Sequence, residues 1–403
     1  MKKYRTSMIV NQSFQVNYEY NVAYTRDLFD EKNRTLVRLL GENRSKVMIF
    51  VDDKVAEAFP AFARQAQRWA AAYPDSIDLA APVEVIPGGE AIKKGWQTVT
   101  DITRRMMDGG ICRHSYVMMV GGGAVLDAVG FAAAVFHRGV RQIRVPTTLL
   151  AQDDSGVGVK NGINHNGAKN LFGCFYPPDA VIIDYQFLRT LSDRDIQSGV
   201  AEALKVALIK DEALYHFIKT NADAIRKIHW PVLEHLVLES SRLHLEHIGG
   251  GDPFEKGSSR PLDFGHWSAH KLETMTRNQV LHGEAVAVGM ALDIYNAALM
   301  EMISMDLADE ILDTMRSCGL VLWHDALLQR DGSGQLRLLS GLEEFREHLG
   351  GRLTLAMPTG IGSFVDVHAL PDHIVEQALR MLQAADRGRL PADTNALNEN
   401  RVM

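Results

Sequence analysis

Three side chains that could bind a metal ion stand in apolar, helix-like segments of the chain. Glu202 lies in GVAEALK, His266 in DFGHWSAH and His282 in LHGEAV. One carboxylate and two imidazoles form a common zinc-ligand set that leaves a position for water or substrate. A zinc-protease motif is excluded: His270 follows His266 at helical spacing, but Trp267 stands where HExxH needs glutamate. Any single histidine would more simply be structural, whereas the set of three predicts one divalent metal site.

A glycine-rich turn is the candidate for binding a nucleotide. The apolar run ending at Val120 is followed by Gly121–Gly123 and by a helical pattern expected to begin near Val125. Backbone without side chains beside a helix N-terminus can bind a pyrophosphate, although an ordinary strand-to-helix turn has the same pattern. Upstream, IPGGEAIKK offers Glu90 for ribose hydroxyls and Lys93 as a cation, or else forms a solvated loop.

The segment from Arg144 to Gly173 has the highest density of polar side chains. It contains five glycines and little apolar cover, so we expect a long loop. A loop of this length without a function is uncommon, because its backbone groups must be satisfied with no gain in packing. Lysines and asparagines on such a loop suit a phosphorylated polyol. Its polar residues include Thr147, Thr148, Asp154, Lys160, Asn164, Lys169 and Asn170.

The elements that must position these residues differ between the two halves of the chain. In the first half, short β-branched apolar runs alternate with helical patterns, one of which predicts a helix over Ala56–Tyr73. Such alternation is typical of a parallel sheet with right-handed crossovers. Residues 1–188 are therefore predicted to form an α/β nucleotide-binding domain. The predicted strands are VMIFV from Val47, VEVI from Val83, YVMMV from Tyr116, QIRV from Gln142 and AVII from Ala180.

From about Thr190 the apolar pattern becomes a series of long helical periodicities. The domain boundary is placed between Asp184 and Ser192, where a strand ends and Ser192 or Asp193 could cap a helix. Residues 189–385 are predicted to form a mostly α-helical domain that binds metal and substrate. The polar tail, residues 386–403, has no apolar period and is expected to be mobile.

Composition limits the possible partners and the compartment. The 403 residues include 43 lysines plus arginines and 50 acidic residues, a net charge of -7, so neither nucleic acid nor an anionic membrane is an expected partner. Three distant cysteines favour a reducing compartment, and the N-terminus lacks the apolar core of a signal peptide. A cytoplasmic protein is expected. The apolar stretch from Val117 to Phe136 contains Gly121–Gly123 and Asp127, which predicts a strand, a turn and a helix rather than a membrane span.

Seven longer motifs make the chain resemble a known family. Between Val47 and Gly362 they are, in order, PGGEAIK, GGGAVLDAVGF, HRGVRQIRVPTTLLAQDDSGVGVKNGIN, GAKNLFGCFYPPDAVIID, GVAEALK, DFGHWSAH and LHGEAVAVGM. With them the chain resembles the sugar phosphate cyclase superfamily, whose best-known member is 3-dehydroquinate synthase. The resemblance implies a dehydroquinate synthase-like fold and an enzyme that uses NAD and one divalent metal, normally zinc. Such a carbon–oxygen lyase closes a sugar phosphate into a carbocycle, eliminates phosphate and regenerates NAD.

The motif match also implies roles for individual residues. Glu202, His266 and His282 match metal ligands, and Arg138 matches an arginine that reaches the phosphate site of the neighbouring subunit, which implies a homodimer. The positions around NAD correspond to Asp52, Glu90, Lys93, Gly122, Gly123, Asp127, Thr147 and Thr148. The positions expected to be catalytic are Asp154, Lys160, Lys205 and His270, and those expected to bind substrate are Arg138, Lys169, Asn170 and Asp263.

Departures from 3-dehydroquinate synthase bear on the substrate. Those enzymes carry a Lys, an Arg and an Asn where this chain has Leu245, Ser259 and Asp263. A substrate carboxylate would lose two counter-charges and meet Asp263, at a cost on the order of several kcal/mol if buried. A neutral ketose phosphate, sedoheptulose 7-phosphate, is therefore the expected substrate. Asp263 resembles the valiolone-forming branch, and His270 stands where GHTWSP enzymes have proline, so the expected product is the C7 cyclitol 2-epi-valiolone.

Four alternatives stay open. Formation of 2-epi-5-epi-valiolone differs only in which face of an enolate attacks, and 3-dehydroquinate synthase activity is the next alternative. A glycerol-dehydrogenase-like oxidoreductase would share the two-part plan and release NADH, but the polar segment from Asp154 to Asn170 argues against it. An inactive NAD-binding regulator is disfavoured because the metal-ligand and catalytic positions are intact, namely Glu202, Lys205, His266 and His282. The metal itself is open among zinc, cobalt and nickel.

Overall fold

The five strands predicted in the first half of the chain belong to one sheet of seven. The computed structural model describes residues 9–41, 43–257 and 259–388. All pairings within this sheet are parallel, in the order β1-β9-β6-β5-β2-β3, with β4 also on β2. The predicted parallel α/β fold is confirmed. The strands are β1 (Asn21–Thr25), β2 (Ser45–Asp52), β3 (Ile77–Leu79), β4 (Glu84–Ile86), β5 (Tyr116–Gly121), β6 (Arg141–Pro146) and β9 (Ala180–Asp184).

Helices cover both faces of the sheet because its strands carry apolar side chains on both. In β2, Val47 and Ile49 pack with Trp69 on one face, whereas Met48 and Phe50 join a second core on the other. Side chains alternate across a strand, so the continuous apolar run serves both cores. The helices are α1 (Thr35–Leu40), α2 (Asp53–Ala58) and α3 (Phe62–Ala72) on the first face, and α4 (Trp96–Asp108) and α5 (Gly123–Val135) on the second.

One predicted helix is interrupted, and another begins two residues earlier than expected. The helix expected over Ala56–Tyr73 is divided into α2 and α3, with Pro60 between them. Proline donates no backbone N–H and disfavours helical geometry in the residue before it. The helix expected near Val125 begins at Gly123, with Gly122 at its N-cap. The apolar stretch from Val117 is nevertheless a strand, a turn and a helix, as predicted.

The polar segment expected to be a loop is largely ordered secondary structure. It forms a π-helical turn, η3 (Ala151–Ser155), and an antiparallel hairpin of β7 (Lys160–His165) and β8 (Ala168–Phe175). Its backbone is satisfied by strand pairing and by the buried Arg144 guanidinium, which donates to the carbonyl oxygens of Gly158 at 2.7 Å and Lys160 at 3.0 Å. The loop prediction failed because the segment supplies its own partners: its two strands pair, and Arg144 at its start bonds to carbonyl groups 14 and 16 residues further along.

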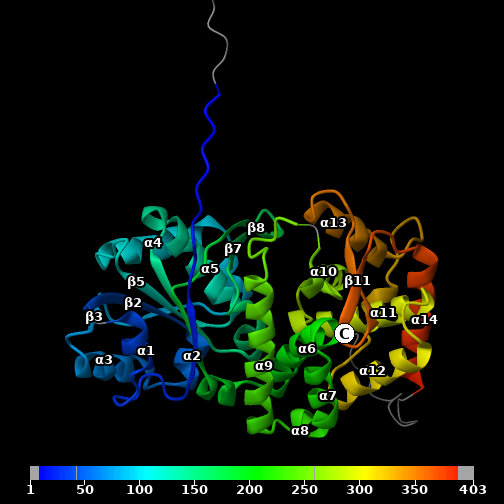
Figure 1. The fold of residues 1–403 in the computed structure, drawn as a ribbon, viewed down its shortest axis with the longest axis horizontal. Helices are drawn as coiled ribbons and strands as arrows, with labels where there is room; N and C mark the ends of the chain where they lie inside the picture. The colour runs from blue at the N-terminus through cyan, green and yellow to red at the C-terminus, as the bar shows by residue number, and fades with distance from the viewer. Residues whose placement is uncertain (1–8, 42, 258, 389–403) are drawn as a thin grey trace, which may run out of the picture.

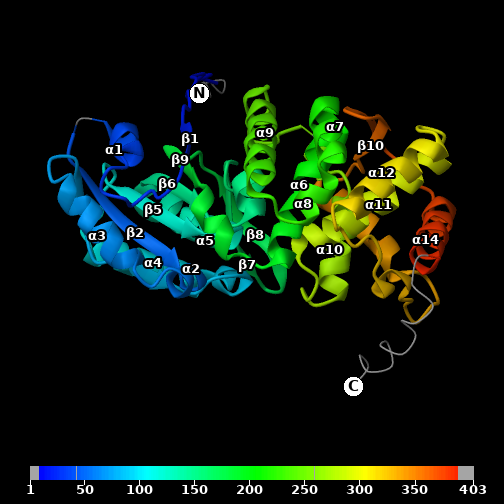
Figure 2. The ribbon, with the colours of Figure 1, turned by 90° about the horizontal axis from the view of Figure 1, so that it is seen from below.

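The second part of the chain is mostly helical, as predicted, and lies beside the sheet (Figures 1 and 2). The Ser192 hydroxyl accepts from the Asp195 N–H at 3.2 Å, which confirms the predicted cap. A hairpin of β10 (Leu355–Gly360) and β11 (Ser363–Val367) was not predicted. The helices are α6 (Asp193–Lys210), α7 (Glu212–Thr220), α8 (Ala222–Arg226), α9 (Trp230–Gly249), α10 (His266–Met275), α11 (His282–Leu299), α12 (Met305–Ser317), α13 (Ser340–His348) and α14 (Asp372–Arg387).

The end of the described chain corrects one boundary. The tail was expected from residue 386, but α14 continues through Arg387. The rest of the predicted tail, residues 389–403, lies outside the described residues. Within the described ranges, none of the helices has both the length and the apolarity needed to cross a membrane. The domain boundary at 188/189 stays a prediction.

Candidate active site and metal centre

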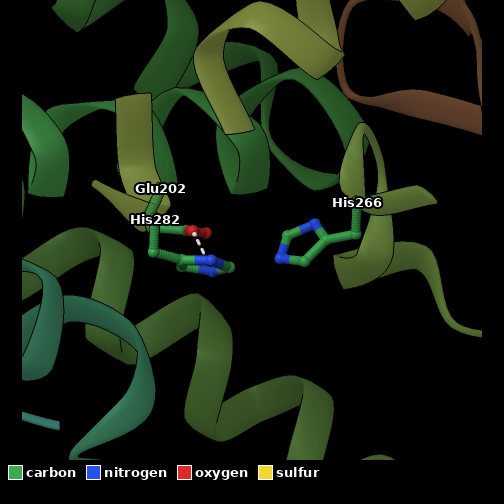
Figure 3. A group of neighbouring side chains, drawn as sticks. All are labelled: Glu202, His266 and His282. Atoms are coloured by element: carbon green, nitrogen blue, oxygen red, sulfur yellow. Dashed lines mark ion pairs between the residues drawn. The ribbon is translucent and has the colours of Figure 1, made fainter. Parts of the chain in front are cut away.

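The three predicted metal ligands come together from three helices. Glu202 lies in the middle of α6, and His266 and His282 are the first residues of α10 and α11. One possible ligand atom from each lies within 4.8 Å of the others. Figure 3 shows both imidazole rings directed toward the space beside the carboxylate. Residues separated by 80 positions in sequence thus form one compact donor set.

A close contact between α6 and α11 brings Glu202 and His282 together. A Cβ atom at Gly283 would lie 1.8 Å from the Ser198 carbonyl oxygen, so a side chain cannot fit there. The Gly283 N–H also donates to the Ser198 hydroxyl at 3.1 Å. Ser198 and Glu202 are four residues apart and share a face of α6. Glycine at 283 therefore lets the start of α11 approach the face that carries Glu202.

His282 lies between two carboxylates. Its Nε2 is 3.5 Å from Glu202 Oε1, and its Nδ1 is 3.4 Å from Glu273 Oε1. Although burial lowers it, the carboxylates of Glu273 and Glu202 raise the pKa of His282 above its usual value. A proton on Nδ1 is thus directed to Glu273, which leaves Nε2 as the donor atom on the Glu202 side.

The surroundings of His266 favour the neutral form of its imidazole ring. Its Nδ1 lies 3.1 Å from the Phe264 carbonyl oxygen, to which a protonated Nδ1 donates. Burial, with a smaller effect of the Lys205 ammonium, lowers the pKa of His266 well below its usual value. A neutral ring with its proton on Nδ1 presents a lone pair at Nε2.

Glu273 is a site residue that the sequence reasoning missed. It is buried, and its carboxylate contacts His270 Nδ1 at 3.1 Å, His282 Nδ1 at 3.4 Å and Lys169 Nζ at 2.9 Å. Burial raises the pKa of Glu273, but the larger combined effect of the two histidines and Lys169 lowers it to well below the usual range. The available signal was the spacing of His270 and Glu273, which are three residues apart and share a face of α10. His270, Glu273 and His282 also form a second group of possible metal ligands.

Lys205 and Asp154 form a buried charged cluster with Glu202. Lys205 Nζ lies 2.5 Å from Glu202 Oε2, and both side chains are buried. Although burial lowers it, the carboxylates of Glu202 and Asp154 raise the pKa of Lys205. The Asp154 carboxylate contacts Nδ1 of His244 at 3.1 Å. His244 was not predicted, because only the fold brings α9 next to η3.

The lysines of the β7–β8 hairpin are already paired with carboxylates. Lys160 forms an ion pair with Glu255, which was also missed, and Lys169 pairs with Glu273. Asn170 accepts from Lys93 through its side-chain oxygen. The hairpin therefore connects the predicted nucleotide side of the site to the predicted metal side.

The residues predicted to surround NAD gather at the carboxyl ends of β2, β5 and β6. Gly122 caps α5, and a Cβ there would lie 3.3 Å from the Thr148 side chain. Thr147 donates its N–H to the Gly121 carbonyl at 3.0 Å, which joins the ends of the two central strands. Lys93 pairs with Asp127 at 2.7 Å. Glu90 and Asp52 complete the set: Asn164 donates to Glu90 at 2.6 Å, and Asp52 caps α2.

Arg138 and Asp263 are two predicted substrate-binding residues that are not members of the ligand triad. Arg138 is exposed, with φ at 65°, and makes no hydrogen bond or ion pair to any residue that the structure describes. Asp263 is half-buried just before α10. Burial lowers the pKa of Lys205, but the carboxylates of Glu202 and Asp154, and to a smaller extent that of Asp263, raise it. Asp263 therefore acts on the charged cluster, whereas Arg138 contacts none of the described site residues through a hydrogen bond or ion pair.

Comparison with known proteins identifies the class. Family models for the N-terminal and C-terminal parts of 3-dehydroquinate synthase match residues 83–198 and 199–336. The 2-epi-valiolone synthase of Actinosynnema mirum is 35% identical over 315 residues, which cover 76% of this chain and 81% of that protein. The 3-dehydroquinate synthase of Dictyoglomus thermophilum is 34% identical over 296 residues, 73% of this chain and 81% of that protein.

A solved structure supports the same assignment. ValA, the 2-epi-5-epi-valiolone synthase of Streptomyces hygroscopicus subsp. jinggangensis 5008, was solved with NAD+ and Zn2+ bound. It matches with a TM-score of 0.82 and 28% identity, covering 94% of this chain and 100% of that one. The chain belongs to the 3-dehydroquinate synthase family. Within that family it is a sugar phosphate cyclase, a lyase-type enzyme.

Proposed function

We propose that this enzyme cyclises sedoheptulose 7-phosphate to the C7 cyclitol 2-epi-valiolone and releases phosphate. The observation that carries the substrate assignment is Asp263, a half-buried carboxylate that acts on Lys205 at the position where 3-dehydroquinate synthases have asparagine. The similarity to the 2-epi-valiolone synthase of Actinosynnema mirum supports the choice of product. Because the chain is nearly as similar to 3-dehydroquinate synthase, the proposed substrate depends on the charges around Asp263 and Lys205.

Glu202, His266 and His282 are proposed to hold one divalent ion, and zinc fits because ValA contains it. The donor set suits such an ion. Glu202 is buried with its Oε1 facing Nε2 of His282 at 3.5 Å, and the low pKa of His266 keeps its ring neutral. NAD is proposed at the carboxyl ends of β2, β5 and β6, where Gly122 leaves the start of α5 uncovered. When bound, NAD accepts and returns a hydride, and the ion acidifies a substrate hydroxyl.

The remaining residues are proposed to orient the substrate and move protons. Lys160, Lys169, Asn170 and Arg138 of the partner subunit would surround the sugar phosphate, which makes a homodimer part of the proposal. Lys205 and Asp154 lie in the buried cluster beside Glu202. His270 is half-exposed at the edge of the site, and Glu273 holds its Nδ1, so its Nε2 is free to exchange a proton with substrate.

The charges of the site favour a substrate whose only anionic group is its phosphate. Lys160, Lys169 and Lys205 are each paired with a carboxylate of the chain. A substrate carboxylate near Asp263 would have to displace one of these carboxylates to obtain a counter-ion. Leu245 and Ser259, which stand where the 3-dehydroquinate synthases have Lys and Arg, provide no replacement cation.

The test is incubation of the metal-loaded enzyme with NAD and sedoheptulose 7-phosphate. Stoichiometric phosphate release without net NADH would support a cyclase acting on this substrate. Accumulation of NADH would support the glycerol-dehydrogenase-like alternative instead. Product NMR then separates 2-epi-valiolone from 2-epi-5-epi-valiolone, and turnover of only the heptulosonate phosphate would return the chain to 3-dehydroquinate synthase activity.

A further inference from the structure

A buried carboxylate outside the ligand set connects the two helices that carry the histidines. Asp293 lies in α11 and is 1% exposed. Its Oδ1 accepts from the Trp267 indole N–H at 2.9 Å and from the Asn296 side-chain amide at 3.1 Å. The Gly265 backbone N–H also donates to this carboxylate. Two of the three donors are therefore the residues on either side of His266.

The turn before His266 leaves little freedom for other conformations. Gly265 has φ at 77°, a left-handed conformation that favours glycine. A Cβ at Gly265 would lie 2.7 Å from the Met290 backbone nitrogen, and a Cβ at Gly289 would lie 2.1 Å from the Gly265 carbonyl oxygen. The start of α10 is therefore in direct backbone contact with α11, and its orientation depends on the groups that hold it there.

Helical geometry places Asp293 on the same face of α11 as His282. The two residues are 11 positions apart, about three turns and ~20° of rotation at 100° per residue. Gly289, which contacts Gly265, is seven positions from His282 and also lies on that face. One face of α11 thus carries a histidine at its start, the contact with α10 in its middle and the supporting carboxylate beyond it.

We propose that Asp293 is a positioning residue for the metal centre, because it holds Gly265 and Trp267 and so fixes where His266 meets His282. The proposal rests on the metal site under Proposed function. His266 Nδ1 is held by the Phe264 carbonyl, in the same short turn. A carboxylate that accepts from both neighbours of His266 limits the rotation of this turn, so the imidazole is oriented before a metal binds.

The test measures the zinc affinity of the full-length protein by competition with a chelator, together with the Tm of its metal-free form. Asp293→Leu removes the acceptor at similar volume, and Trp267→Phe removes one donor but keeps an aromatic ring. We expect Asp293→Leu to weaken zinc binding about 10–100-fold, the range typical of groups that orient metal ligands. Trp267→Phe should weaken it less, and the double variant should bind no more weakly than Asp293→Leu alone, since both changes break one contact.

A matched control separates positioning from general stability. Thr314→Val removes the buried hydrogen bond between Tyr215 and Thr314, 3.2 Å long and in another part of the helical core. It should lower the Tm while leaving zinc affinity unchanged. With cobalt(II) in place of zinc, the visible absorption spectrum should change in the Asp293 variants but not in Thr314→Val.

Three outcomes are informative about which idea fails. If Trp267→Phe and Asp293→Leu both bind zinc as tightly as the unmodified protein, Asp293 is not a positioning residue. If Asp293→Leu does not fold, Asp293→Asn and Trp267→Phe carry the test, and unchanged zinc affinity in both overturns the proposal. If His282→Ala also keeps full zinc affinity, the metal site itself is wrongly assigned.

Discussion

Nδ1 of His282 lies 3.4 Å from Oε1 of Glu273, on the opposite side of the ring from the nitrogen that faces Glu202. A carboxylate therefore faces each nitrogen of the His282 ring. When the proton on Nδ1 is donated to Glu273, Nε2 keeps its lone pair on the side of Glu202. The consequences for metal binding can be measured residue by residue.

His282→Ala should remove the metal and the activity together, because a donor set of three protein ligands loses one imidazole. Metal content of the purified variant and phosphate release are the measurements. Full metal occupancy in this variant would contradict the assignment of Glu202, His266 and His282 as the site.

Glu273→Gln should weaken metal binding about 10–100-fold, because the amide no longer offers a charged acceptor to His282. Lys169 loses its counter-ion as well, so KM for the sugar phosphate is expected to change. The measurement is zinc competition with and without substrate. Glu344→Gln is a suitable control, because Glu344 pairs with Lys271 at the surface; equal effects of the two changes would count against a role for Glu273.

Arg138 is expected to act across a subunit interface, because it has no partner among the described residues of its own chain. Arg138→Ala should lower kcat/KM about tenfold or more, and Arg138→Lys should not restore it fully, since lysine cannot bind phosphate through two donors. Mixing the Arg138→Ala and Lys160→Ala proteins should regenerate one intact site per mixed dimer and recover activity. Unchanged kcat/KM in Arg138→Ala would refute the shared site and the argument for a dimer.

Asp263 is expected to exclude a substrate carboxylate. The unmodified enzyme should turn over the heptulosonate phosphate with a kcat/KM at least about 100-fold lower than sedoheptulose 7-phosphate, the equivalent of roughly 3 kcal/mol. Asp263→Asn should narrow this gap by removing repulsion, and adding Ser259→Arg should narrow it further. Comparable rates of the unmodified enzyme on both substrates would overturn the argument.

His244 should make the fold sensitive to acid. Burial lowers its pKa to about 4 despite the nearby Asp154 carboxylate. The unfolded chain, with an ordinary histidine pKa near 6.5, binds this proton more readily than the folded protein, so stability is fully present above that value and is lost as pH falls toward 4. The loss from this group can reach roughly 3 kcal/mol. His244→Gln should flatten the decline of the urea midpoint between pH 7 and pH 4; an unchanged slope would show that other groups cause it.

Local sequence determined the elements of this protein and the identity of most candidate site residues. Short continuous apolar runs predicted five of the seven strands of the parallel sheet, and Ser192 was recognised as a cap, because these properties depend on residues a few positions apart. Glu202, His266 and His282 were identified by chemical type and by motif, and the structure brings them together.

Only the tertiary structure decided which distant groups serve those residues. Three side-chain contacts join different elements: Glu273 with His282, His244 with Asp154, and Asp293 with Trp267. Such pairs arise from how helices and sheet pack, and neither periodicity nor spacing along the chain encodes them. The hairpin of β7 and β8 is different, because its turn at Asn166 and Gly167, both with positive φ, is a local signal that the sequence reasoning did not use.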